Sequence, residues 1–283
     1  MSIKSSMKSI RHSGRRALAR WRWGALDGPV LFGNSFPKSG THLLTQVLEG
    51  FTALGPAVDS GLPPVITFDG PTGKPRPLAA ILVDLARLRP GDVAYGHLHA
   101  EPEIQAALCA DGVVPYFISR DPRDVVVSHV HYVTEMEPNH VHHRYYTEKL
   151  HTFEERLRVS ILGLPELDVP FPDIAGRFAP YLGWLERPEM LCLRYEDFLS
   201  TPQETLGRVL DHATARGFKC RVAREQAISI LHKHIDPKRS PTFRSGQAGG
   251  WRKHFTPEVI TLFKQASGDL LTRLGYEPDA NWS

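Results

Sequence analysis

The sequence predicts an α/β fold, a single domain in which a central, mostly parallel sheet is flanked by helices. Short apolar runs alternate along the chain with segments of helical periodicity, which is typical of parallel sheets covered on both faces. The length of 283 residues suits one large domain. The composition, 41% hydrophobic and 23% charged, is ordinary for a globular protein. In such sheets ligands bind beyond the carboxyl ends of the strands.

Apolar runs and periodic segments set the expected elements. Buried strands are expected at residues 28–36, 92–96, 113–119 and 190–194. Helices are expected at residues 41–52, 77–88, 101–110, from 121 onward, and at 148–162, 173–186, 202–216 and 256–274. The Pro- and Gly-rich residues 54–77 predict a long loop, and the polar residues 136–147 predict irregular structure.

Residues 1–26 form a basic arm that differs in charge from the rest of the chain, residues 27–283. The basic side chains of the first 23 residues, which include no acid, are Lys4, Lys8, Arg11, Arg15, Arg16, Arg20 and Arg22. The other 260 residues hold 27 basic and 31 acidic side chains, a net charge of −4. A mildly acidic body excludes a general nucleic-acid binder, so an anion site must be built locally.

The arm itself has two interpretations. Its apolar residues recur at spacings compatible with one helical face, namely Ile3, Met7, Ile10, Ala17 and Trp21. This pattern favours an interfacial helix on an anionic membrane or on a partner. The alternative, favoured by Gly14 and several serines, is a disordered or core-packed arm.

The expected location and metal content follow from signals that we do not find in the sequence. No run of about 18 apolar residues predicts a membrane span, and the N-terminus lacks the apolar core of a secretory signal. Cys109, Cys192 and Cys220 are far apart and odd in number, which favours a reducing compartment. We therefore expect a cytoplasmic protein, or a membrane-peripheral one if the arm binds lipid. We expect no metal.

Residues 35–44 (SFPKSGTHLL) join a predicted strand end to a predicted helix start. A helix start presents free backbone N–H groups and the positive end of the dipole. Gly40 allows an anion to approach the backbone, Ser39 and Thr41 add hydroxyl donors, and Lys38 adds charge. The segment therefore predicts a P-loop-like, phosphate-binding strand-loop-helix. It is not the Walker A pattern, because its Lys precedes its single Gly. The alternative is an ordinary turn with a surface Lys.

Residues 117–128 (FISRDPRDVVVS) predict a second anion-binding segment. Asp121 suits a helix N-cap and Pro122 suits the first helical position. Arg120 then lies at the carboxyl end of a strand, where its planar fork can bind a phosphate in bidentate fashion. Ser128 lies about two turns into the helix. In the alternative, the two arginines of the segment only pair with its two aspartates at a surface.

Residues 243–253 (FRSGQAGGWRK) predict a third segment of this kind. Dense glycine beside Arg and Ser, just before a helix, suits a loop that folds over an anion. The alternative is a flexible linker.

In this order and at these separations, the three segments resemble the motifs of the PAPS-dependent sulfotransferase family of cytosolic and bacterial type. PAPS is 3′-phosphoadenosine-5′-phosphosulfate. PKSGTHLL resembles the family's 5′-phosphosulfate loop, RDPRDVVVS its 3′-phosphate motif and RSGQAGGWRK its RKGxxGxWK loop. Residues 194–197 (RYED) resemble its YED segment. The resemblance spans about residues 28–275 and implies a sulfotransferase domain at 27–283.

The resemblance assigns binding roles residue by residue. It implies that the 5′-phosphosulfate is held by Lys38, Ser39, Gly40, Thr41 and His42. It implies that the 3′-phosphate is held by Arg120, Ser128, Arg244, Ser245 and Gly246. It implies contacts to the adenine side from Tyr195 and Ser229.

The family's catalytic histidine lies between the first two motifs, and here His97 aligns with it, with His99 as a substitute. A neutral imidazole can take the proton of an alcohol as the new S–O bond forms. Lys38 can neutralise charge on the leaving phosphate oxygen. The resemblance thus implies in-line transfer of a sulfuryl group from PAPS to a hydroxyl or amine. The alternative for His97 is a packed core residue.

The sequence departs from the family pattern at several positions. Leu43 stands where an aromatic residue often stacks on adenine, and His42 stands where Thr is common. Tyr95 replaces a Lys two residues before the catalytic His. Residues 252–261 (RKHFTPEVIT) break the dimer motif of the cytosolic group. Adenine stacking and the oligomeric state therefore stay open.

Other histidines and aromatic residues form patterns without a motif. The histidines are His129, His131, His140, His142, His143 and His151. Without HExxH or CxxC nearby, we expect an exposed or acceptor-facing loop rather than a zinc site. Phe178, Tyr181 and Trp184 stand at helical spacing, which favours core packing over a cofactor box.

Two other function classes remain as alternatives. One is a nucleotide-phosphate kinase, which the absence of GxxxxGK[ST] disfavours. The other is a catalytically silent PAPS- or partner-binding module, which the presence of both His97 and Lys38 disfavours. The acceptor is a small molecule, a glycan or a lipid headgroup, shaped by the loops at 54–77 and 131–172, and the basic arm favours an acceptor near a membrane.

Overall fold

The computed structural model describes residues 3–70, 72–240 and 246–283, with side chains from residue 12 onward. Its contacts divide the chain into two compact units. Unit 1 comprises Met1–Thr67, Pro77–Ser119 and Gly183–Pro241. Unit 2 comprises Phe68–Arg76, Arg120–Leu182 and Thr242–Ser283.

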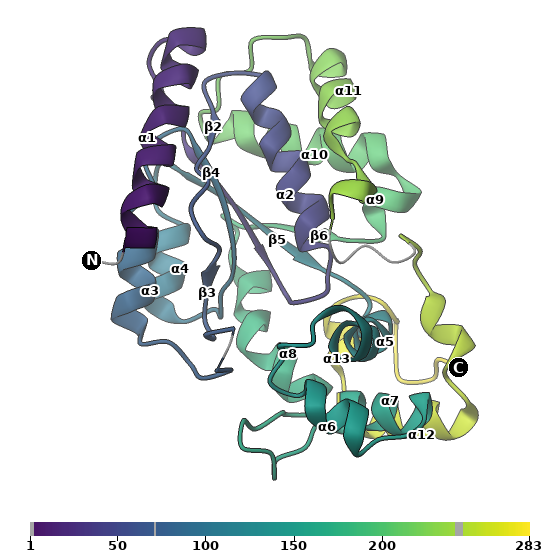
Figure 1. Cartoon of the computed structure of the whole chain (residues 1–283). Coiled ribbons are helices and arrows are strands. Elements are labelled where there is room, and N and C mark those ends of the chain that lie inside the picture. Colours follow the sequence, from purple (N-terminus) through teal and green to yellow (C-terminus); the bar gives the residue numbers. More distant parts are fainter. Residues whose placement is uncertain (1–2, 71, 241–245) are drawn as a thin grey trace. The chain divides into compact units, whose positions relative to one another are not determined.

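Unit 1 contains a six-stranded sheet in which every strand pairing is parallel. Its strands are β1 (Val30–Ser35), β2 (Val58–Asp59), β3 (Val65–Ile66), β4 (Asp92–His97), β5 (Val113–Ser119) and β6 (Leu191–Arg194). The order is β2-β4-β1-β5-β6, and β3 also pairs with β4 (Figure 1). The predicted strands are confirmed. β2 and β3 lie inside the predicted loop, because two-residue strands leave no periodicity to detect.

The register brings the carboxyl ends of four strands to one edge of the sheet. Asn34 of β1 pairs with Gly96 of β4, and Ser35 pairs with Ile118 of β5. Ser119, at the end of β5, pairs with Arg194 at the end of β6. The segments that follow β1, β4, β5 and β6 therefore begin side by side, where ligands of parallel sheets bind.

Helices of unit 1 cover the sheet. They are α2 (Thr41–Gly50), α3 (Leu78–Leu85), α4 (Pro102–Leu108), α9 (Asp197–Ser200), α10 (Pro202–Ala215) and α11 (Arg224–His234). Figure 1 shows α2, α10 and α11 together on one side and α3 beside α4 on the other. The largest core cluster lies under the first group and includes Leu31, Val47, Leu48, Val114, Tyr116, Leu206, Val209 and Leu231. This arrangement confirms the predicted α/β class.

Helix α11 was not predicted, and its composition explains why. Only Ala227, Ile228 and Leu231 of this helix are buried. Charged or polar residues fill most of its other positions, so the apolar stripe is too narrow to stand out. Packing against α2 and α10 stabilises it instead.

The basic arm forms helix α1 (Ile3–Trp23), which packs against unit 1. His12 and Arg16, each 5% exposed, reach the fully buried carboxylate of Asp92. The distances are 3.0 Å from His12 Nε2 and 2.5 Å from Arg16 Nη1. The face of the arm that carries His12 and Arg16 is therefore packed against unit 1, as the core-packed alternative predicted. No helix in the described part of the chain is long and apolar enough to cross a membrane.

Unit 2 is helical. Its helices are α5 (Pro122–His131), a π-helical turn at Tyr132–Met136, α6 (His143–Glu148), α7 (Phe153–Leu162), α8 (Ile174–Leu182), α12 (Pro257–Ser267) and α13 (Leu270–Arg273). Helix α6 lies in a segment predicted to be irregular. The expected helix at 148–162 begins later, because Thr152 and Glu155 form a capping box that starts α7. The expected helix at 256–274 is broken at Gly268, whose φ is 52°.

Gly96, directly before His97, is required by the close pairing of β3 with β4. A Cβ atom at this position would overlap the Val65 carbonyl oxygen and lie 3.0 Å from Phe32 Cζ. We expect Gly96→Ala to lower the free energy of unfolding by about 1–3 kcal/mol, as overpacking does. Urea denaturation measures this.

Gly14→Ala is the matched control, since a Cβ atom there meets nothing within 4 Å. In a helix interior this change should raise stability by roughly 0.5–1 kcal/mol. A Gly96→Ala protein as stable as the wild type would contradict the β3–β4 pairing.

Candidate functional site

The loop between β1 and α2 turns tightly because two of its residues are left-handed. Lys38 has φ 68°, unusual for a residue with a side chain, and Gly40 has φ 96°. The Ser39 N–H donates to the Phe36 carbonyl at 3.2 Å, which closes the turn. Helix α2 then starts at Thr41, as predicted. Its first N–H groups lie at the sheet edge where the strands end.

Gly40 is held against an aromatic ring. A Cβ atom at Gly40 would lie 2.6 Å from Tyr195 Cδ2 and 3.3 Å from Ile118 Cδ1. The Tyr195 N–H donates to the Ser119 carbonyl at 2.8 Å, which continues the β5–β6 pairing. The structure thus brings Tyr195 against the loop. Only glycine fits at position 40, because a Cβ atom would overlap the Tyr195 ring and because the backbone is left-handed.

Ser39 has the environment of an anion ligand. It is fully buried, and its Oγ has no hydrogen-bond partner among the described residues. A buried hydroxyl left unpaired costs roughly 1–3 kcal/mol. An anion that accepts from this hydroxyl would offset that cost. Together with the helix start and the Lys38 charge, the loop is chemically suited to a phosphate or a sulfate ester.

His97 ends β4 and is oriented by Ser35 of β1. Its Nδ1 lies 3.0 Å from the Ser35 carbonyl oxygen and 3.1 Å from Ser35 Oγ. A carbonyl oxygen only accepts, so Nδ1 carries the proton and Nε2 keeps its lone pair. Ser35 Oγ is also 2.8 Å from Thr41 Oγ1. A hydrogen-bond network therefore joins the β1–α2 loop to the imidazole.

Burial keeps His97 neutral. It lowers the pKa of His97, and the neighbouring His42 and Lys38 lower it further, while the hydrogen bond to the Ser35 carbonyl opposes the shift. Burial and the Lys38 charge also lower the pKa of His42. Both imidazoles are therefore uncharged near neutral pH, as a general base must be.

His99, the predicted substitute, is less suited to the role. Burial lowers its pKa to about 4. A base this weak takes a proton from an alcohol with little driving force. The backbone N–H of His99 donates to Thr67 Oγ1 at 3.1 Å. This hydrogen bond connects the segment after β4 to the residue that follows β3.

Two further predicted positions in unit 1 are less closely tied to the loop. Leu43 packs at the edge of the core cluster below α2. Ser229 lies exposed on α11, the helix that packs on α2.

In unit 2 the second and third motifs are brought together by Asp124. Its Oδ2 accepts from the Gly249 N–H at 2.7 Å, and its Oδ1 accepts from the Trp251 N–H at 2.9 Å. Arg120 Nη2 donates to the Gln247 carbonyl at 2.8 Å. The first turn of α5 thus holds the glycine-rich loop in place. The sequence pattern predicted at most a surface pairing for Asp124 and gave no signal of this role.

Arg123 is structural. Its guanidinium makes a bidentate ion pair with Asp121 and a further pair with Glu277 at 2.6 Å. It also lies over the rings of Trp251 and Trp282, with centroid distances of 4.2 and 4.7 Å. Asp121 at the same time caps α5 through the Arg123 N–H at 2.9 Å, as predicted. Arg123 therefore pairs with Asp121 as the alternative predicted, but it is buried rather than at a surface. Arg120 Nη2 likewise lies 3.8 Å from Asp124 Oδ2.

The remaining 3′-phosphate positions are placed only in part. Ser128 is partly exposed in α5, between the buried residues Val127 and His129. Gly246 is left-handed, with φ 62°. Arg244 and Ser245 lie outside the described residues.

Two residues of the histidine-rich segment, His129 and His142, are buried, which corrects the prediction of an exposed loop at these two positions. His129 stacks on Phe171 with a centroid distance of 4.8 Å, and its Nδ1 lies 3.1 Å from Ser160 Oγ. His142 is buried, and its Nε2 lies 3.1 Å from the Val169 carbonyl oxygen. Among the described residues no group of three or more His, Cys, Asp or Glu is arranged to hold a metal. The predicted core placement of Phe178, Tyr181 and Trp184 is confirmed.

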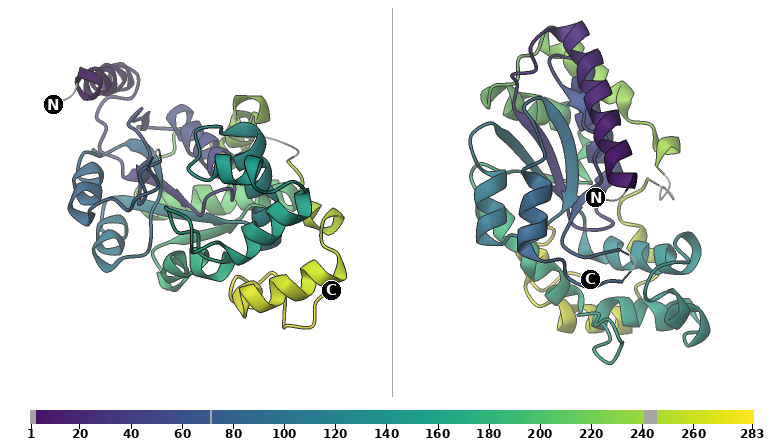
Figure 2. Two further views of the ribbon diagram at one scale, coloured as in Figure 1. Left: turned by 60° about the horizontal axis from the view of Figure 1, so that its bottom comes forward. Right: turned by 60° about the vertical axis from the view of Figure 1, so that its left-hand side comes forward.

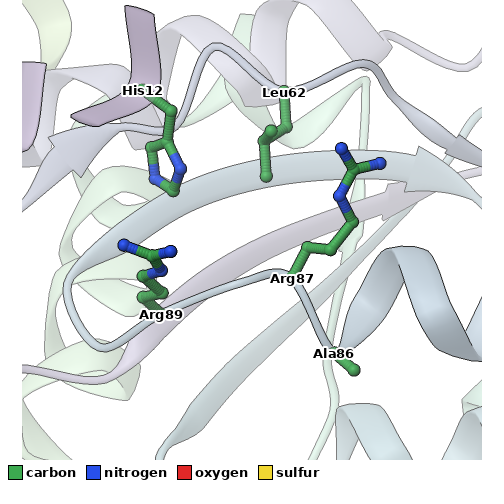
Figure 3. Close-up of a pocket in the computed structure, with 5 residues that line it drawn as sticks. All are labelled: His12, Leu62, Ala86, Arg87 and Arg89. Atoms are coloured by element: carbon green, nitrogen blue, oxygen red, sulfur yellow. The ribbon is translucent and has the colours of Figure 1, made fainter. Parts of the chain in front are cut away.

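Two cavities of unit 1 contain none of the predicted site residues. One, of about 160 Å³, is lined by His12, Leu62, Ala86, Arg87 and Arg89. Figure 3 shows its side chains around the turn that joins α3 to β4. The other, of about 370 Å³, is lined by Ile230, Lys233, His234, Asp236 and Arg239 near the end of α11.

The Asp124 contacts predict a local effect of substitution. We expect Asp124→Asn to lower the free energy of unfolding by about 1–3 kcal/mol, because the amide cannot accept from both N–H groups with its two side-chain atoms. The backbone amides of Gly249 and Trp251 should then exchange faster with solvent. Native-state hydrogen exchange measures both effects, and Asp168→Asn serves as the surface control. Unchanged exchange at these two amides would contradict the assignment.

Comparison with known proteins gives one family match and several structural neighbours. A family model described as a sulfotransferase domain matches residues 116–275. A search of the curated proteins finds no match. Retinol dehydratase in complex with androsterone and the inactive cofactor PAP superposes with a TM-score of 0.57 at 18% identity, over 90% of this chain and 82% of that chain.

Two further solved structures show a similar likeness. Retinol dehydratase in complex with retinol and PAP has a TM-score of 0.57 and 18% identity, over 86% of this chain and 82% of that one. Mouse sulfotransferase SULT7A1 complexed with PAP has a TM-score of 0.58 and 19% identity, over 95% of this chain and 91% of that one. At these identities the likeness shows a shared fold.

Proposed function

Because the chain belongs to the sulfotransferase domain family, we propose that it is a PAPS-dependent enzyme that transfers a sulfuryl group to a hydroxyl or amine. One observation carries this proposal. The hydrogen-bond network from Thr41 through Ser35 to His97 joins an anion-binding loop to a neutral imidazole with a free Nε2. A base beside an anion loop is the minimum that sulfuryl transfer requires.

The residues of the β1–α2 loop fit the 5′-phosphosulfate of the donor. In this proposal it is held by Lys38, Ser39, Gly40, Thr41 and His42. The unpaired, buried Oγ of Ser39 supports the assignment, since it needs an acceptor. The glycine at position 40 supports it as well, since the backbone stays accessible to an anion. PAP is bound in the solved structures that share this fold.

The 3′-phosphate is assigned to Arg120 and Ser128, with Arg244, Ser245 and Gly246. The hydrogen bond from Arg120 to the Gln247 carbonyl supports this assignment, because it orients the planar guanidinium beside the glycine-rich loop. Tyr195 is assigned to the adenine side, with Ser229 as a further contact. With Leu43 in place of an aromatic residue, the Tyr195 ring beside the loop supports its assignment to this role.

His97 and Lys38 are the proposed catalytic residues. Bound PAPS supplies a sulfuryl group whose leaving group is the 5′-phosphate of PAP. His97 Nε2 accepts the proton of the acceptor hydroxyl, while Nδ1 stays hydrogen-bonded to the Ser35 carbonyl and fixes the ring. Lys38 balances the negative charge on the leaving oxygen. In-line geometry then requires no metal to bridge two phosphates.

The acceptor is proposed to be a small hydroxylated molecule. A glycan and a lipid headgroup are the alternatives. Androsterone and retinol, bound in structural neighbours, are both small. A cytoplasmic location is proposed as well, and the three free thiols at Cys109, Cys192 and Cys220 support a reducing compartment. The division into an arm at 1–26 and a sulfotransferase domain at 27–283 stays a prediction.

The donor assignment is tested by calorimetry without any acceptor. We expect the wild-type protein to bind PAP without magnesium and to bind ATP much more weakly. Arg120→Ala should weaken PAP binding roughly 10- to 100-fold, because a charge-assisted hydrogen bond contributes about 1.5–3 kcal/mol.

Arg144→Ala is the matched control, since Arg144 is exposed and pairs only locally with Glu148. Absence of PAP binding in the wild type would refute the sulfotransferase proposal. Tight, magnesium-dependent ATP binding would favour the kinase alternative.

The role of His97 is tested by turnover and its pH dependence. His97→Ala should reduce PAP release from PAPS, assayed with a panel of phenols and sterols, by about 10²- to 10⁴-fold while PAP affinity stays unchanged. The base acts when neutral and its pKa is lowered. The acid limb of kcat/KM should therefore have its midpoint below about 6.5, the ordinary histidine value.

His99→Ala is the control and should keep most of the turnover. If His99→Ala abolishes turnover and His97→Ala does not, the base has been assigned to the wrong residue. An acid limb well above the ordinary histidine pKa would also contradict the burial argument.

A further inference from the structure

Helix α1 is fixed to unit 1 along one face. His12 and Arg16 on this face are buried against Asp92, and Arg16 Nη1 also donates to the Pro90 carbonyl at 3.0 Å. Trp23, which follows at the same helical spacing, donates from Nε1 to the Thr52 carbonyl at 3.3 Å. The orientation of the helix about its own axis is therefore set by buried polar contacts.

The opposite face of α1 is apolar and exposed. Leu18 is 68% exposed and Trp21 is 86% exposed, the highest value among the exposed large hydrophobic residues of the described chain. At 100° per residue, positions 14, 18 and 21 lie across the helix from positions 12, 16 and 23. In the sequence, Ile3, Met7 and Ile10 precede them at the same spacing. Figure 2 shows α1 at the margin of unit 1.

Basic residues lie on both flanks of the apolar face. Arg20 falls on one flank and Arg22 on the other, and both are exposed. Among the side chains of the arm that the structure describes, Arg15 pairs with Asp59 and Arg16 with Asp92, whereas no acid pairs with Arg20 or Arg22. No acid occurs among the first 23 residues to balance them.

The combination of exposed apolar residues and flanking basic residues favours an anionic lipid surface as the partner of this face of α1. A second copy of α1 would bring the same positive charge to the same face, which disfavours self-association. An apolar stripe flanked by Lys and Arg is the pattern of helices that lie in the membrane interface, and tryptophan concentrates there. Nucleic acid would be attracted by the charge but would leave Leu18 and Trp21 in water.

We propose that α1 binds in the plane of an anionic membrane, with Leu18 and Trp21 inserted among the lipids and Arg20 and Arg22 at the headgroups. The buried contacts to Asp92 make α1 a rigid part of unit 1, so the membrane holds the whole unit in one orientation. This proposal does not depend on the sulfotransferase activity.

The test is co-sedimentation of the full chain with phosphatidylcholine vesicles, with and without phosphatidylserine. Wild-type protein should bind the vesicles that contain phosphatidylserine, and high salt should weaken the binding. The Leu18→Glu, Trp21→Glu double variant should bind at least about tenfold more weakly, because both insertion and charge attraction are lost. Arg20→Glu, Arg22→Glu should lose the preference for phosphatidylserine.

The matched control is Val83→Glu, which changes another exposed apolar residue of unit 1, 62% exposed on α3. It should bind like the wild type. PAP calorimetry on every variant shows that the fold is intact and keeps this test separate from that of the donor site. Wild-type protein that ignores phosphatidylserine vesicles would overturn the proposal. So would a dimer, seen by light scattering, that the Leu18→Glu, Trp21→Glu variant abolishes while vesicle binding stays unchanged.

Discussion

The parallel pairing of every strand is the constraint on which the site depends. Parallel neighbours end at the same edge, so residues far apart in sequence meet there without any further device. Ser35 of β1 can orient His97 of β4 because the two strands are paired in register. Tyr195 reaches Gly40 for the same reason, from the far side of β5. A shift of register by one residue would turn His97 to the other face of the sheet.

Buried polar groups have two different uses in this protein. Some are fully paired and hold elements together, such as Asp92 under α1 and Asp124 beneath the glycine-rich loop. Others are left incomplete, such as the Oγ of Ser39. An unpaired buried donor is costly, and the proposed donor site would offset that cost at Ser39. The paired groups set the geometry, and Ser39 Oγ is one of several buried side-chain atoms of the described residues that lack a partner.

The two arginines of the second motif show how neighbours with the same charge diverge. Arg123 is enclosed by Asp121, Glu277 and two tryptophan rings, so its charge is balanced by the two carboxylates. Arg120 donates to the Gln247 carbonyl, and its Nη2 also lies 3.8 Å from Asp124 Oδ2. Sequence spacing treats the two alike. Only their surroundings show that Arg123 is held by two carboxylates and two aromatic rings.

The sequence by itself determined the α/β class, the longer strands, the cap of α5, the anion loop and the position of His97. These depend on local chemistry, such as apolar runs, a proline at a helix start and a glycine beside hydroxyl residues. Tertiary structure alone decided what depends on neighbours distant in the chain. It decided the tautomer of His97, the role of Asp124, the packing of His129 and His142, and which face of α1 is exposed. The physical reason is that burial and pairing partners are set by contacts across the fold, and these leave no periodic trace in the sequence.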